Sequence, residues 1–61
     1  MPTYRLELIL AGGQIAQTLA FFSLDDKKAL AWGSGVMELA LHGAYPTAEV
    51  WEAKRLVGKL H

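Results

Sequence analysis

The sequence from Ser23 to Gly43, SLDDKKALAWGSGVMELALHG, carries the start, the apolar stripe and the end of a single helix. Ser23 can cap the first turn, and Asp25 and Asp26 place negative charge at the positive end of the helix dipole. Gly43 can adopt the left-handed backbone that ends a helix, and Pro46 follows it. We therefore expect one helix along this stretch.

One face of this helix is predicted to be buried. At about 100° per residue, the inward positions are apolar or small: Leu30, Gly33, Met37, Ala40 and Leu41. Trp32 and Leu39 lie at the margin of this face, where they can cover the edge of the core or meet a partner. Gly33 faces inward, so a close approach to a sheet can offset its poor helix propensity. Gly35 faces outward and has no such explanation.

The chain before the helix alternates between apolar and polar residues, which is typical of strands with one buried face. Tyr4 to Leu10 forms the first strand and Gln14 to Phe22 the second, with Gly12 and Gly13 in the turn between them. We expect an antiparallel hairpin.

Residues 47–60 allow two interpretations. As a helix, the segment has Thr47 as its cap and apolar residues at helical spacing. As a hairpin, it has strands over 48–52 and 55–60 around a short turn. Propensity alone slightly favours the helix.

Four short motifs bear on this choice: Tyr4-Arg5-Leu6, Gly12-Gly13, Asp25-Asp26 and the segment VWEAKRLV over 50–57. With these motifs the chain resembles a group of small, functionally uncharacterised bacterial single-domain proteins that end in a Val-Trp-Asp-Gly-x-Arg-Leu-Val hairpin. The resemblance implies a hairpin here too, and it carries no activity or site. Glu52-Ala53 replaces Asp-Gly at the turn, where a left-handed alanine costs roughly 1–2 kcal/mol.

The fold predicted from these elements is α+β, in the order β-β-α-β-β, as a single domain over residues 1–61; the alternative order is β-β-α-α. The remaining predicted core positions come from the strands: Leu6, Leu8, Leu10, Ile15, Leu19, Phe21, Val50, Leu56 and Leu60.

Composition excludes several classes of protein. The 61 residues hold six basic and six acidic side chains and no cysteine, so disulfides and thiolate metal sites are ruled out. Zero net charge argues against a general nucleic-acid or membrane binder. No apolar run approaches a membrane span and no secretory signal is evident, so we expect a cytoplasmic protein. A small domain without such cross-links favours oligomerisation.

No catalytic or ligand-binding motif is present. Gly33-Ser34-Gly35 interrupts a helix, whereas phosphate-binding glycine loops precede one. The histidines have no second ligand at a recognisable spacing. We therefore predict no enzyme activity, no cofactor and no metal site.

The sheet face away from the helix is the predicted contact surface. Its apolar members are Ile9, Phe22, Trp51 and Val57, and an apolar patch of this kind usually marks an interface. We predict a non-catalytic protein-interaction module that binds itself, through the sheet face or an edge, or another protein. Phe22 and Trp51 would anchor the contact.

The alternative is a small module that binds single-stranded nucleic acid. Phe22 and Trp51 could stack on bases while Arg5, Arg55 and Lys59 meet phosphates. Zero net charge and acidic residues on the same face argue against this alternative.

Overall fold

The computed structural model describes residues 1–41 and 47–61, except for the side chains of Ala40 and Leu41. The strands and the helix follow the chain in this order: β1 (Thr3–Ile9), β2 (Ile15–Phe22), α1 (Asp26–Leu41), β3 (Thr47–Glu52) and β4 (Arg55–Leu60). The predicted α+β order β-β-α-β-β is confirmed. The tail forms a hairpin, so the helical alternative for this segment is wrong.

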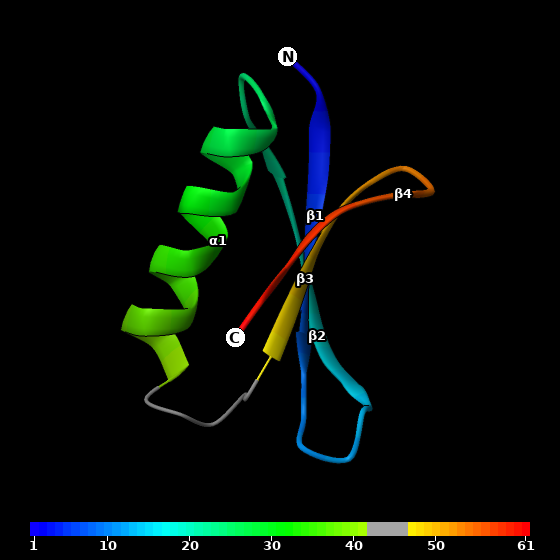
Figure 1. Cartoon of the computed structure of the whole chain (residues 1–61), viewed down its shortest axis with the longest axis vertical. Helices are drawn as coiled ribbons and strands as arrows, with labels where there is room; N and C mark the ends of the chain where they lie inside the picture. Colours follow the sequence, from blue (N-terminus) through cyan, green and yellow to red (C-terminus); the bar gives the residue numbers. More distant parts are fainter. Residues whose placement is uncertain (42–46) are drawn as a thin grey trace.

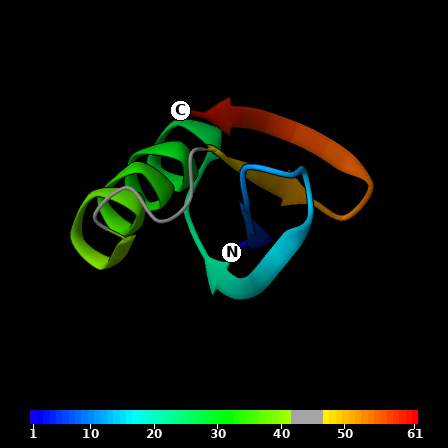
Figure 2. The same ribbon diagram turned by 90° about the horizontal axis from the view of Figure 1, so that it is seen from below.

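The four strands form one sheet in the order β2-β1-β3-β4, and all neighbouring strands are antiparallel. Because β2 and β3 both run antiparallel to β1, they run parallel to each other, and α1 connects them across the sheet (Figure 1). Strand β1 is therefore central, whereas β2 and β4 are the edges. The helix lies on one side of the strands only (Figure 2).

The helix begins later than the sequence predicts. The backbone N–H of Lys28 donates to Asp25 Oδ1 at 2.8 Å, so Asp25 is the cap and Ser23 is not. The N–H of Ser23 donates to the carbonyl of Pro2 at 3.3 Å, which keeps the chain extended at this point. The predicted helix end at Gly43, and Pro46 after it, lie outside the described residues.

The core lies between α1 and the inner sides of β1 and β3. Its buried members come from these three elements: Tyr4, Leu6, Leu8, Ala29, Ala48 and Val50. Gly33 confirms the predicted close approach, because a Cβ there would lie 2.9 Å from Leu60 Cδ1 and 3.2 Å from Val50 Cγ2. Leu19, Phe21, Leu30, Met37 and Leu60 pack around the buried residues, as predicted.

Three predicted core residues are instead exposed: Leu10 by 38%, Ile15 by 55% and Leu56 by 40%. Leu10 precedes the first turn, which extends past the helix (Figure 1). Ile15 is opposite Ile9, because Ala16 is an extra residue in β2, so Ile15 shares the outer face with Ile9. Leu56 is opposite Trp51, whereas Gly58 is opposite Val50, so Val57 is an extra residue in β4. This bulge shifts the alternation of side chains and turns Leu56 away from the core.

Both hairpin turns contain a residue with positive φ, as the sequence predicts. Gly13 has φ 88°, and its N–H donates to the carbonyl of Leu10 at 2.8 Å. Ala53 has φ 54°, the left-handed conformation that the glycine of the related motif would adopt more easily. The second hairpin therefore forms despite a strained alanine.

Candidate interaction surface

The outer face of the sheet is built by the residues that alternate with the core positions. On β1, the side chains of Arg5, Glu7 and Ile9 lie between the buried ones. Strand pairing places Trp51 beside Arg5 and Glu49 beside Glu7. The centre of this face is thus occupied by charged residues around one indole ring.

The charged and polar groups of these residues pair with one another. Arg5 Nε lies 3.1 Å from Glu7 Oε2, and the guanidinium carbon lies 5.1 Å from the centre of the Trp51 ring. Trp51 Nε1 donates to Glu49 Oε1 at 3.2 Å, and Lys59 Nζ lies 3.9 Å from the other oxygen of Glu49. Arg5 therefore partly covers the ring of Trp51, and the indole N–H already donates a hydrogen bond to Glu49.

The four predicted contact residues do not form one patch. Phe22 is 69% exposed, whereas Ile9 and Trp51 are half-buried. Phe22 is opposite Thr3, at the other end of β1 from Ile9, about 20 Å away at ~3.4 Å per residue. Val57 is half-buried and packs against the core cluster, so its prediction as part of an exposed patch is wrong.

The cations of the nucleic-acid alternative also have partners. Arg5 is bound to Glu7, and Lys59 lies beside Glu49. Arg55 was expected on the outer face, but its guanidinium forms a two-point ion pair with Asp26 at the start of α1, at 2.9 and 3.0 Å. The bulge in β4 accounts for this difference, because it changes which side chains share a face.

Asp26 joins three parts of the chain. It accepts a hydrogen bond from Tyr4 Oη at 3.0 Å in addition to the pair with Arg55, which also binds Glu52. The hydrogen bonds from Arg55 and Tyr4 lower the pKa of Asp26. Burial and the hydrogen bond to Asp26 raise the pKa of Tyr4, and the carboxylates of Asp26 and Glu52 raise that of Arg55. The cluster thus links β1, the start of α1 and the second hairpin, with one guanidinium between two carboxylates.

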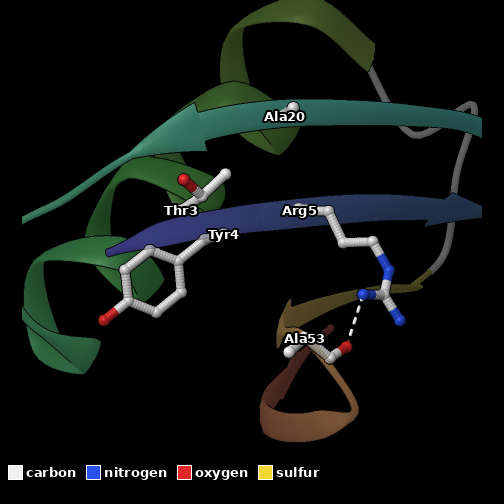
Figure 3. A pocket seen from close by; sticks show the side chains of 5 residues that line it. All are labelled: Thr3, Tyr4, Arg5, Ala20 and Ala53. Carbon is white, nitrogen blue, oxygen red and sulfur yellow. Dashed lines mark hydrogen bonds between the residues drawn. The ribbon is translucent and has the colours of Figure 1, made fainter. Parts of the chain in front are cut away.

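A shallow hollow of about 320 Å³ lies at the start of β1. It is lined by Thr3, Tyr4, Arg5, Ala20 and Ala53 (Figure 3). Arg5 donates across it to the carbonyl of Ala53 at 2.5 Å, while the ring of Tyr4 turns the other way. The guanidinium of Arg5 is thus bound to the turn of the second hairpin. The surface of the hollow is therefore mainly apolar.

The sequence allows an edge strand as the contact surface but does not say which strand; β2 is one free edge of the sheet. The strand reads IAQTLAFF and contains no charged residue, glycine or proline. Its side chains are exposed, apart from half-buried Leu19 and Phe21. The other edge strand, β4, reads RLVGKL and contains two cations, a glycine and a bulge. Strand β2 has an irregularity of its own at Ala16, but residues 17–22 pair regularly with β1 and carry no charge. Charges and bulges protect an edge from pairing with another chain, so among the strands that the structure describes this part of β2 is the unprotected edge.

Further apolar side chains surround this edge. Leu24 follows β2 and is 62% exposed. Trp32 of α1 stacks on Phe21 with ring centres 4.1 Å apart and is still 42% exposed. The apolar surface of the molecule thus continues from β2 onto the helix. The absence of charge in the segment was visible in the sequence, but its place at an edge was not.

No family model, curated protein or solved structure matches this chain. The resemblance to the bacterial group therefore stays a prediction. Within residues 1–41 and 47–61, no helix is long and apolar enough to cross a membrane. The same described residues contain no group of three or more potential metal-binding side chains.

Proposed function

We propose that this protein is a non-catalytic interaction module that self-associates through the free edge of β2. The observation that carries the proposal is the contrast between the two edges of the sheet. Residues 17–22 of β2 form a regular stretch with unpaired backbone groups and no charge, whereas β4 carries Arg55 and Lys59 and has a bulge in its middle. An unprotected edge of this length is a template for pairing with another strand.

A second copy of this chain is the partner that the charges favour. Strand β2 offers no charge for a partner of opposite sign to bind. The whole chain has zero net charge, so two copies do not repel each other. Pairing of two β2 edges would also cover Phe22, the most exposed of the predicted contact residues.

The outer face of the sheet is the weaker candidate for this contact. Its central charges are already paired, and Trp51 lies partly under Arg5. The same pairing leaves the nucleic-acid alternative without a free cation among Arg5, Arg55 and Lys59. We therefore place the contact on the edge.

The cytoplasm is the proposed location, and a bacterium the proposed source. A chain without cysteine suits a reducing compartment, since it needs no disulfide. The bacterial source follows only from the resemblance of the four short motifs.

Light scattering behind size exclusion, over a range of protein concentrations, tests the proposal. We expect the wild type to approach twice 6.7 kDa as the concentration rises. Thr18→Lys places a cation on β2, opposite Glu7 of the same chain, where it is compatible with the fold. We expect this variant to weaken association at least tenfold, about 1.4 kcal/mol.

Ser34→Lys is the matched control, because it adds the same charge on the exposed side of α1. It should associate like the wild type. A monomeric wild type would overturn the proposal. A dimer that survives Thr18→Lys but is lost in Trp51→Asp would move the contact to the outer face.

A further inference from the structure

We infer that the self-association proposed above is a closed two-fold dimer, in which β2 pairs antiparallel with β2 of a second copy around an axis at Leu19. This inference rests on the proposed function and specifies its geometry. It predicts how many copies assemble and which residues oppose each other.

The assembly stops at two copies because, in the part of the chain that the structure describes, each molecule has one regular edge without charge, residues 17–22 of β2. An antiparallel β2–β2 contact uses the same surface on both copies, as two-fold symmetry requires. The edges left free are then the two β4 strands, whose cations and bulge oppose further pairing. A continuous sheet with both helices on the same face results.

The axis must pass through a residue of β2 and not between two residues. Directly opposed side chains in an antiparallel pair lie on the same face. Leu19 and Phe21 oppose the core residues Leu6 and Tyr4, so they lie on the helix side. Thr18 opposes Glu7 and lies on the outer side. An axis between Thr18 and Leu19 would place Thr18 of one copy opposite Leu19 of the other. These side chains lie on different faces of the sheet, so this axis is excluded.

Leu19 is favoured over Thr18 as the centre. The pairing of β2 with β1 is regular from Gln17 to Phe22, and the register shifts beyond Gln17, where Ala16 has no partner. An axis at Leu19 keeps the pairs Gln17–Phe21 and Thr18–Ala20 within this regular part. It also places Phe22, which is 69% exposed, beside the small Ala16 of the second copy.

An axis at Thr18 is the neighbouring register. It would bring Phe22 beside Gln14, beyond the end of the partner's strand. The exposed ring would then stay largely uncovered. The register at Leu19 therefore covers more apolar surface.

Disulfide trapping tests this register, because the chain has no cysteine of its own. With the axis at Leu19, residues 18 and 20 of the two copies are opposed at about 4.5–5.5 Å between Cα atoms, within reach of a disulfide. Residue 18 of one copy and residue 18 of the other lie diagonally across the strand pair, about 7–8 Å apart, which is too far for a disulfide. Thr18→Cys and Ala20→Cys both change exposed positions.

The two single variants are mixed, oxidised mildly and analysed by mass spectrometry and non-reducing electrophoresis. We expect a shift from 6.7 kDa to twice that mass, with the mixed Thr18→Cys/Ala20→Cys disulfide as the main product. Ser34→Cys, on the exposed side of α1, measures linkage through random collision and should stay monomeric.

The other outcomes separate the inference from the proposed function. If Thr18→Cys links mainly to itself, the axis lies at Thr18 and the inference is overturned. If light scattering shows a dimer but the mixture gives no more linkage than Ser34→Cys, β2 is not paired in this register, although self-association stands. If light scattering shows only monomer, both fail.

Discussion

At the scale of single residues, Ala53 shows what the second hairpin requires. It is the one non-glycine with positive φ among the described residues, at 54°. Its carbonyl accepts the hydrogen bond from Arg5, so the turn is held by a side chain of the central strand. The turn thus keeps its geometry through a tertiary contact, although its sequence lacks the usual glycine.

Ala53→Gly should stabilise the protein. Glycine removes the cost of a left-handed alanine, roughly 1–2 kcal/mol. Glycine also makes the unfolded chain more flexible, which offsets part of this gain, so we expect the free energy of unfolding to rise by about 0.5–1 kcal/mol. Chemical denaturation monitored by circular dichroism measures the difference. Lys54→Gly is the control, because Lys54 has no positive φ and glycine there should destabilise. Equal effects of the two changes would contradict the role assigned to Ala53.

At the scale of the elements, α1 contains two glycines with opposite surroundings. A Cβ on Gly33 would lie close to side chains of Leu60, Val50 and Leu6, whereas one on Gly35 would meet nothing within 4 Å. Both cost the helix similar propensity. Only Gly33 is therefore required for packing against the sheet.

Gly35→Ala should stabilise the protein by about 1 kcal/mol, because alanine is the better helix former. Gly33→Ala should be less stable than Gly35→Ala by about 1–3 kcal/mol, since the added methyl group overpacks the contact with β1, β3 and β4. Thermal and chemical unfolding of the two variants measure this difference. Equal stabilities would mean that Leu60 and Val50 move aside freely.

At the scale of the whole molecule, the cluster around Asp26 joins β1, α1 and the second hairpin. Tyr4, Asp26 and Arg55 are far apart in the sequence and meet at one end of the sheet. The pKa of Asp26 is lower in the folded state than its ordinary value. Its contribution to stability is therefore fully present above the unfolded pKa and is lost as the pH falls through the folded pKa.

Asp26→Asn should lower the Tm at neutral pH by a few degrees. The difference from the wild type should shrink as the pH falls from the ordinary range of an aspartate, about 4, through the lower pKa of folded Asp26. Thermal unfolding between pH 7 and pH 2 measures this. Asp25→Asn is the control, since asparagine caps a helix as well as aspartate. A difference that stays constant with pH would show that charge at Asp26 does not stabilise the fold.

The sequence by itself determined the first hairpin and the helix of this protein. Alternation specified the strands of the first hairpin, glycines placed its turn, and the helix periodicity identified Gly33 as an inward residue. These features are local, because they depend on side chains a few positions apart. The second hairpin was predicted only with the help of the resemblance, because the apolar residues over 47–60 fit both the spacing of a helix and the alternation of strands.

The tertiary structure alone decided the order of the strands and the faces of several side chains. Nothing local says that β1 lies between β2 and β3, which makes β2 an edge. The bulge in β4 exposed Leu56, packed Val57 against the core and accompanied the turn of Arg55 toward Asp26. A bulge adds one residue to a pairing between distant segments, so no period within one strand reveals it. The surface proposed for self-association depends on that same non-local pairing, because an edge is defined by the strand that is missing beside it.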